Sequence, residues 1–232
     1  MNKIYFLFML LLALFFTSAQ SLKVEYEVQF KSKDTPELTG SSDFQNKIKS
    51  LIDAPQRHIL SYSDGNSVYK SILPEVIYNS NKENDFDDEI RKNIYERKQI
   101  KIFKLKNEKG AYGYHNLKNE EFYQYVIPHF DILQTLETTE KILGHICKIA
   151  EAEMGNKNKA KVWYTEQINI KTGPMAFYDF PGLVLKVETR NMSIIAKKVE
   201  KDVGNISLET LDKNIKVYEG EAFAEKMRQL TN

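Results

Sequence analysis

An alternation of apolar and polar residues near the N-terminus constrains the fold more than any other feature of the sequence. Every second residue from Leu22 to Phe30 is apolar, namely Leu22, Val24, Tyr26, Val28 and Phe30. In a β-strand these side chains share one face, because successive side chains point to opposite sides, whereas a helix would scatter them around its circumference. The pattern predicts a strand with one buried face, and therefore a sheet.

Strand patterns recur along the rest of the chain. We expect further strands at His58–Tyr62, Ser67–Ile72, Tyr95–Leu105, Glu121–Ile127, Lys141–Glu153, Ala160–Gln167, Gly182–Thr189 and Ser193–Val199. The first two of these flank Asp64-Gly65-Asn66, whose residues tolerate the positive φ of a hairpin turn. Asn191 is expected to mark the turn between the last two. The sequence thus predicts a mainly β, mostly antiparallel fold in one continuous domain from residue 20 to 232.

Helical patterns are limited to two short segments. Ser42–Ile52 places apolar residues at nearly i, i+4, i+7 and i+8, with Ser41 or Ser42 as the N-cap. Gly220–Leu230 carries an apolar stripe that predicts an amphipathic C-terminal helix, packed on the body of the protein. Between them, Asn79–Glu89 is polar and acidic. It lacks the glycine and the distal glutamate of an EF-hand, so we interpret it as a solvated loop or a helix cap.

Residues 1–19 have the features of a secretory signal peptide. Lys3 is followed by an unbroken apolar run from Ile4 to Phe16, and small residues end at Ala19. Such a run is shorter than the roughly 20 residues that a membrane-spanning helix needs. We therefore expect cleavage after Ala19, no remaining transmembrane anchor, and an exported protein, periplasmic or extracellular.

Charge and cysteine content exclude several classes of function. The chain has 33 Lys and Arg against 32 Asp and Glu, and loss of Lys3 with the signal peptide makes the balance complete. Nucleic-acid binding favours a strong basic excess, so we expect no nucleic-acid partner. The single cysteine, Cys147, excludes an internal disulfide and any cysteine-based metal cluster.

Motifs of catalysis and metal binding are also missing from the sequence. None of the four histidines lies in a His-Glu-x-x-His motif, and no two have i, i+4 spacing. There is no Gly-x-Ser-x-Gly nucleophile motif and no glycine-rich phosphate loop. His129 and Asp131 could pair, but an ordinary surface pair accounts for them. We expect no catalytic residue, no metal and no cofactor.

One segment carries a more specific signal. It contains Gly144-x-x-Cys147-x-x-Ala150, then Trp163-Tyr-Thr, then Gly173-Pro174, then Phe180-Pro-Gly-Leu-Val184. This order resembles the GLPGLI family of secreted Bacteroidetes-type proteins, which has no assigned activity. That family is in turn similar to the bowl-shaped N-terminal domain that precedes the catalytic part of certain bacterial peptide-N-glycosidases. The resemblance implies a curved antiparallel sheet, a bowl or half-barrel, acting as an accessory domain.

The motif segment supplies the candidate site residues, with a structural or a binding role. They are Gly173, Pro174, Phe180, Pro181, Gly182, Leu183, Trp163 and Cys147. The two prolines fix φ near −65° and make 173–182 a rigid loop, while Gly182 permits positive φ or a close approach. Asp179 stands where the family has glycine, so a conformation reserved for glycine is not expected there. Cys147 is expected to be a buried small hydrophobe.

Three functions are compatible with these observations. The first is an exported, non-catalytic module that binds a partner protein, glycan or peptide with a concave sheet face. The second is a periplasmic carrier of a hydrophobic or lipid ligand, which strands rich in tyrosine and phenylalanine would suit. The third is an enzyme with an unidentified active site. A concave face with a large continuous apolar surface would favour the carrier, and a polar one would favour glycan or peptide binding.

Overall fold

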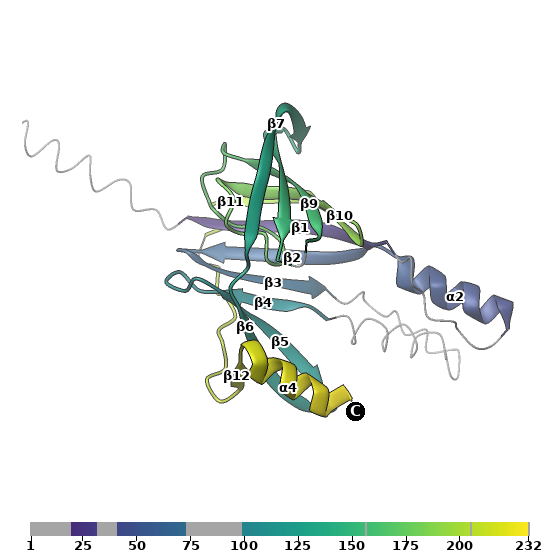
Figure 1. The fold of residues 1–232 in the computed structure, drawn as a ribbon. Coiled ribbons are helices and arrows are strands. Elements are labelled where there is room, and N and C mark those ends of the chain that lie inside the picture. The colour runs from purple at the N-terminus through teal and green to yellow at the C-terminus, as the bar shows by residue number, and fades with distance from the viewer. Residues whose placement is uncertain (1–19, 32–40, 73–98, 156, 205, 232) are drawn as a thin grey trace, which may run out of the picture.

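The structure is a computed structural model that describes residues 20–31, 41–72, 99–155, 157–204 and 206–231. The expected signal peptide and the polar loop Asn79–Glu89 lie outside these residues, as does the first part of the expected strand Tyr95–Leu105. Within them, twelve strands and two helices follow one another (Figure 1). In chain order they are β1 (Ser21–Phe30), α2 (Ser42–Asp53), β2 (Gln56–Ser63), β3 (Asn66–Ile72), β4 (Lys101–Lys104), β5 (Ala111–Leu117), β6 (Glu120–Val126), β7 (Phe130–Ile142), β8 (His145–Met154), β9 (Lys159–Thr165), β10 (Leu183–Thr189), β11 (Met192–Lys201), β12 (Lys216–Tyr218) and α4 (Gly220–Thr231).

All twelve described strands form one open, curved sheet. Their order is β12-β6-β5-β4-β3-β2-β1-β11-β10-β9-β8-β7. Every pair of neighbours is antiparallel except β12 and β6, which run parallel. The expected fold class, a mainly β curved sheet with a C-terminal helix, is confirmed.

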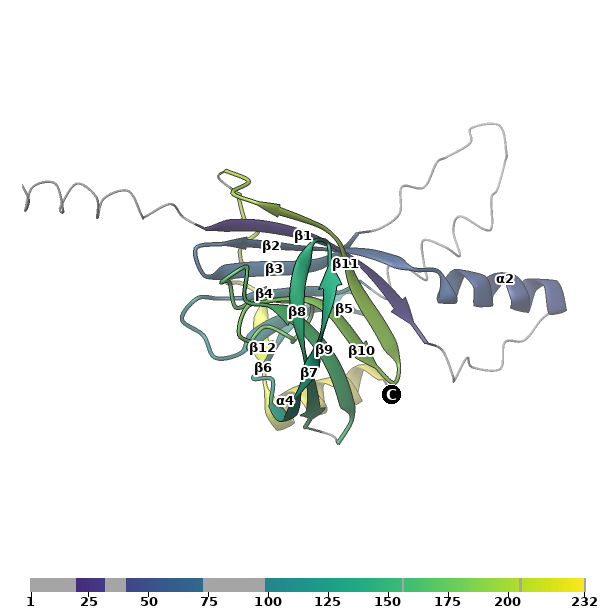
Figure 2. The ribbon, with the colours of Figure 1, turned by 90° about the horizontal axis from the view of Figure 1, so that it is seen from above.

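A three-residue connection forces the sheet to curl. β6 and β7 are consecutive in the chain and joined only by residues 127–129, yet ten strand spacings separate them in the sheet. A flat sheet would place them about 48 Å apart at ~4.8 Å per strand. Four residue steps, from Val126 to Phe130, reach at most ~14 Å. The sheet therefore bends until its two ends approach, and β7 crosses in front of β1 and β2 (Figures 1 and 2).

The main core lies on the inside of this curl. Leu22, Val24, Tyr26 and Val28 of β1 are all at most 1% exposed, as the alternation in the sequence predicts. They belong to one cluster with residues of β2, β3, β8, β9, β10 and β11 and of the loop before β10. The Tyr26 hydroxyl donates a hydrogen bond to the Val184 carbonyl at 2.7 Å and so ties β1 to β10.

The opposite face of the central strands is charged. It presents cross-strand ion pairs, among them Arg57 with Glu25 at 2.8 Å and Lys197 with Glu27 at 2.9 Å. Such exposed pairs contribute little to stability, with a median of about 0–1 kcal/mol. Their arrangement gives the antiparallel sheet one packed and one solvated face.

The C-terminal segment covers the β5–β6 end of the sheet on both faces. Leu208, Leu211 and Ile215 pack on a second cluster formed by Val68, Phe103 and Tyr123. On the other face, Phe223 of α4 contacts Phe122 and His115, with ring centroids 6.3 and 5.3 Å apart. The prediction that the apolar stripe of this helix packs on the body is confirmed. In contrast, α2 projects from one end of the sheet (Figure 1).

Several local predictions are confirmed. Asp64 and Gly65 have φ of 47° and 85° and form the turn between β2 and β3. Arg190 and Asn191 separate β10 from β11, and the Thr189 hydroxyl accepts hydrogen bonds from the backbone N–H groups of Asn191 and Met192. α2 begins at Ser42, where the Ser41 carbonyl accepts the N–H of Gln45 at 3.0 Å.

The prediction of a single strand at Lys141–Glu153 is wrong. Lys141 and Ile142 end β7, Leu143 and Gly144 form a turn with φ of 48° and 84°, and β8 begins at His145. Leucine seldom adopts positive φ, so its position in the turn gave no signal. The strands β5, β12 and most of β7 were not expected at all.

We expect the buried His58 to make stability depend on pH. The residue is 0% exposed, and burial lowers the pKa of its imidazole to about 4 from an ordinary 6.5. Between these values the unfolded chain binds a proton that the folded protein does not, so stability is fully present above pH 6.5 and falls as the pH drops toward 4. The difference is on the order of 3 kcal/mol.

Urea unfolding at pH 7.0, 5.5 and 4.5 measures this loss. The matched variant is His58→Leu, which removes the titrating group. Its stability should change less over the same range, although His115, whose pKa burial also lowers, retains a slope of the same sign. Equal pH slopes for the two proteins would contradict the assignment.

Candidate functional site

The motif loop lies at one corner of the main core. Gly173, Pro174, Phe180, Gly182 and Leu183 are buried, whereas Pro181 is exposed. A parallel bridge between Thr172 and Leu183 closes the loop, and the Val184 N–H donates to the Thr172 carbonyl at 3.0 Å. The structure thus brings together the six candidate residues of residues 173–183.

Two glycines of the loop permit contacts that no side chain could. A Cβ on Gly173 would lie 2.0 Å from the Phe177 carbonyl oxygen, and one on Gly182 would lie 2.2 Å from that of Thr165. Gly182 also has φ of 129°, which L-residues rarely adopt. Asp179, in contrast, does not have positive φ, so it does not adopt a conformation reserved for glycine.

Aromatic rings of the loop fill the inside of the curl. Phe180 contacts Tyr164 of β9 and Phe130 of β7, each at 5.9 Å between ring centroids. Phe177 also contacts Phe130, at 5.0 Å. The loop therefore joins the core strands to the beginning of β7, and most of its side chains are packed rather than available to a ligand.

The other two candidates also belong to the main core cluster, but their side chains alternate along β8 and β9 with those of Ala150 and Val162 and so lie on the other face of these strands. Trp163 is 4% exposed, with the Lys186 ammonium 4.1 Å from its ring centroid. Glu188 and Glu140 hold that ammonium at 3.2 and 3.6 Å. Cys147 is 0% exposed, and burial raises the pKa of its thiol to about 11. Its expected role as a buried small hydrophobe fits this position.

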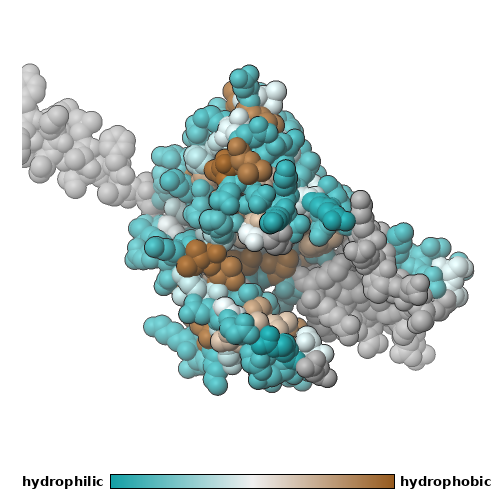
Figure 3. Space-filling view, viewed as in Figure 1, coloured by the Kyte–Doolittle hydropathy of each residue, from teal (hydrophilic) through white to brown (hydrophobic). Residues whose placement is uncertain are grey.

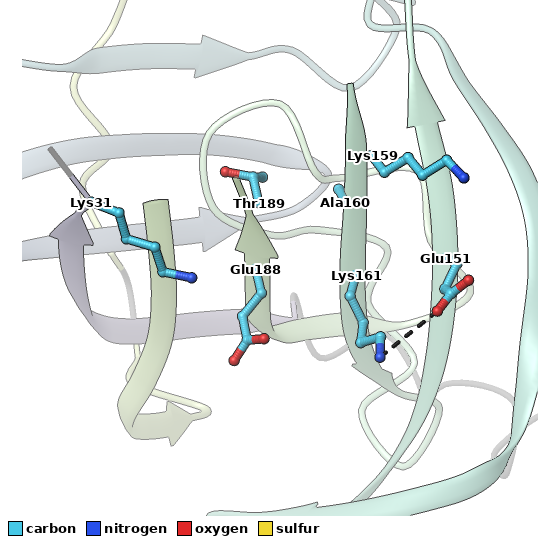
Figure 4. A pocket seen from close by; sticks show the side chains of 7 residues that line it. All are labelled: Lys31, Glu151, Lys159, Ala160, Lys161, Glu188 and Thr189. Atoms are coloured by element: carbon cyan, nitrogen blue, oxygen red, sulfur yellow. Dashed lines mark ion pairs between the residues drawn. The ribbon is translucent and has the colours of Figure 1, made fainter. Parts of the chain in front are cut away.

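A charged groove crosses the ends of β8, β9 and β10 on this face. It has a volume of about 290 Å³ and is lined by Lys31, Glu151, Lys159, Ala160, Lys161, Glu188 and Thr189. Lys161 lies opposite both Glu188 and Glu151 in register, and its ammonium is 3.7 Å from the Glu151 carboxylate. Lys31 lies beyond Glu188 at one end of the row, and Lys159 lies above Lys161 and Glu151 in the view of Figure 4.

A larger pocket lies where the β5–β6 turn, β12 and α4 meet, and we call it the β12 pocket. Its volume is about 550 Å³, and its lining consists of Asn119, Glu120, Glu121, Phe122, Asp212, Asn214, Ile215, Lys216, Tyr218 and Lys226. Carboxylates and amides thus surround the half-buried ring of Tyr218, which meets the buried ring of Phe122 edge to face with centroids 5.8 Å apart.

Hydrogen bonds order the polar rim of the β12 pocket. The Asp212 carboxylate accepts from both the backbone and the side-chain amide of Asn214, at 2.9 and 3.0 Å. Lys226 of α4 forms an ion pair with Glu120. Asn119 lies in the turn before β6 with φ of 64°. Sequence reasoning missed this pocket, because its residues come from segments about 100 positions apart.

Two kinds of site are missing from the part of the chain that the structure describes. No three His, Cys, Asp or Glu side chains there are grouped so that they could hold a metal ion. None of the helices there is long and apolar enough to span a membrane. His129 and Asp131 contact each other at 3.2 Å and are both well exposed, as expected of a surface pair.

Comparison with known protein families shows the family of the chain. Residues 76–222, well over half of its length, match the family described as "N-glycanase peptide, N-terminal domain". The chain belongs to this family. No curated protein matches the sequence.

Solved structures support the same fold. Two structures of PNGF-II, in space groups P21 and C2, superpose with TM-scores of 0.56 and 0.51 at 18% sequence identity. The superpositions cover 91% and 90% of this chain but only 34% and 32% of the PNGF-II chains. The N-glycanase N-terminal domain fold is therefore shared, and the chain spans about a third of the length of those proteins.

The close contact at Gly182 predicts a large loss of stability on substitution. In Gly182→Ala the new methyl group would clash with the Thr165 carbonyl and strain the backbone, so we expect a loss of about 3–4 kcal/mol in urea unfolding. Gly144 also has positive φ, but no atom lies within 4 Å of an added Cβ, so Gly144→Ala should lose about 1–2 kcal/mol of stability. Gly155→Ala, with open space and no positive φ, should be near neutral. An unchanged stability of Gly182→Ala, or of the bulkier Gly182→Val, would refute a structural role for the motif.

Burial of Cys147 predicts that its thiol reacts slowly with disulfide reagents. At pH 8 an aromatic disulfide reagent should modify native protein far more slowly than protein in 8 M urea, because a buried thiol of raised pKa forms little accessible thiolate. Absorbance of the released thiolate follows the reaction. Comparable rates in the two conditions would mean that the strand opens readily.

Proposed function

We propose that this protein is an exported, non-catalytic module that binds glycan-bearing polypeptides, with the β12 pocket as its sugar-binding site. The observation that carries the proposal is the composition of that pocket. Carboxylates, amides and ammonium groups, which pair with sugar hydroxyls as acceptors and donors, border the half-buried ring of Tyr218. A ring of this kind can pack against the apolar face of a sugar.

Family membership points in the same direction. The family name describes an N-terminal domain of N-glycanases, and the substrate of such an enzyme carries a glycan on a polypeptide. An accessory domain that holds the glycoprotein would raise its local concentration at a catalytic domain. Export agrees with this role, as does the motif segment that resembles the GLPGLI family. Both remain predictions from the sequence.

The geometry argues against the two alternative functions. A carrier of a hydrophobic ligand requires an apolar cavity, but Tyr26, Tyr69, Phe177 and Phe180 fill the inside of the curl with rings at most 2% exposed. We therefore place binding at the rim of the sheet rather than on its concave face. An enzyme requires convergent titratable groups, and the loop with the family motif offers backbone contacts and packed rings instead.

Calorimetry with N,N′-diacetylchitobiose and with a larger free N-glycan tests the proposal. We expect saturable binding of at least one of them, weakened tenfold or more in Asn214→Ala and in Tyr218→Ala, which corresponds to about 1.4 kcal/mol or more. Tyr218→Phe, which keeps the ring, should bind more tightly than Tyr218→Ala.

Lys161→Ala, in the charged groove of Figure 4, is the matched control and should bind as the unaltered protein does. Asn214 is exposed and Tyr218 and Lys161 are half-buried, and circular dichroism verifies that each variant folds. Absence of binding at millimolar sugar, or equal affinities in all variants, would refute the proposal.

A further inference from the structure

A second pocket lies next to the β12 pocket, where β12 ends and α4 begins, and we call it the α4 pocket. Its volume is about 470 Å³, and its lining consists of Gln124, Tyr125, Val126, Ile127, Glu219 and Gly220. The same two segments line both pockets. β6 contributes residues 120–122 to the β12 pocket and residues 124–126 to the α4 pocket, and the register pair of Gln124 and Tyr218 lies between them. The two pockets therefore lie end to end along β6.

The separation of the two pockets suits a ligand that extends over both. Phe122 of the β12 pocket and Val126 of the α4 pocket are four residues apart in β6, which corresponds to about 14 Å along a strand. A sugar joined to a few extended amino-acid residues is long enough to cover such a distance. The two pockets can thus receive different parts of one glycan-bearing polypeptide.

The lining of the α4 pocket is more apolar than that of the β12 pocket. Val126 and Ile127 are 42% and 58% exposed. On the mostly hydrophilic surface in Figure 3, one of the separate apolar patches lies at the connection from β6 to β7. The polar side chains of the lining are Glu219 and Gln124, whose Oε1 lies 3.3 Å from Nε2 of His115. Such a lining offers few partners for sugar hydroxyls and fits apolar side chains better.

The course of the chain leaves space for an extended backbone in the α4 pocket. Gly220, with φ of 51°, turns the chain from β12 into α4. Among the described strands, Tyr125 and Val126 therefore have a partner only on the β5 side. The α4 pocket lies in the direction in which a longer β12 would continue, so an extended polypeptide can lie there beside β6.

We propose that the α4 pocket binds the polypeptide next to a glycosylated asparagine, with a preference for apolar residues, while the β12 pocket binds the sugar. This inference rests on the proposed function, because it takes the glycan-bearing polypeptide as the ligand. It adds that the polypeptide part has a pocket of its own. A ligand that carries both parts then binds more tightly than either part alone.

The probe is a blocked pentapeptide, Val-Asn-Val-Thr-Val, with a high-mannose N-glycan on its asparagine, in the Asn-x-Thr order of N-glycosylation sites. Calorimetry compares it with the same glycan in free form and with the same peptide without sugar. We expect the glycopeptide to bind at least tenfold more tightly than either. Ile127→Ser, which removes apolar contact, should reduce this advantage to threefold or less and leave the affinity for the free glycan unchanged within twofold. On the unaltered protein, a glycopeptide with serine in place of each valine should lose the advantage in the same way.

Ile146→Ser is the matched control, because Ile146 on β8 is 55% exposed but lines neither pocket. It should keep the full advantage of the glycopeptide. Equal affinities of the glycopeptide and the free glycan would overturn the inference and leave the proposed function intact. An equal affinity of the sugar-free peptide, or an equal loss in the two variants, would overturn it as well. Absence of binding of both the glycan and the glycopeptide would instead refute the proposed function, and this inference with it.

Discussion

The short connection between β6 and β7 is the constraint on which the rest of the structure depends. Because only residues 127–129 join them, the end of β6 and the start of β7 must lie close together, although ten strand spacings separate these two strands in the sheet. Curvature of the sheet is therefore imposed by covalent geometry, and the side chains on the inside of the curl must fill what it encloses. The motif loop does this with Phe177 and Phe180, which meet Phe130 at the start of β7.

This packing explains why the expected concave binding face is not an open bowl. The resemblance to a bowl-shaped domain implied an accessible inner surface, but the main core occupies it between β1–β3 and β8–β10. Polar pockets instead lie at the margins of the sheet, where turns, β12 and α4 meet the strands. The proposed binding site accordingly lies at the rim of the sheet, while the rings of the interior and the close contacts of Gly173 and Gly182 are part of its packing.

How far the sequence predicted the fold depended on burial. β1 was predictable because one of its faces is buried, so that Val24 and Tyr26 alternate with Glu25. β7 was not, because both of its faces are exposed and its residues show no alternation. β5 contains Gly113 and Asn116, which strands disfavour. The motif loop was predictable as a rigid segment from its prolines and glycines. The β12 pocket was not, because Asn119, Asp212 and Tyr218 meet only through the parallel pairing of β12 with β6.

The central position of β1 has a consequence for how the chain folds. It is the first of the described strands in the sequence, yet it lies between β2 and β11, and the Tyr26 hydroxyl donates a hydrogen bond to a carbonyl 158 residues away. Hairpins such as β2–β3 can form from neighbouring residues soon after synthesis, but one side of β1 has no partner until nearly the whole chain is present. Contacts so distant in sequence make folding slow. Before β11 arrives, one edge of β1 has no partner, so its protection from aggregation during this interval is a requirement for producing the protein.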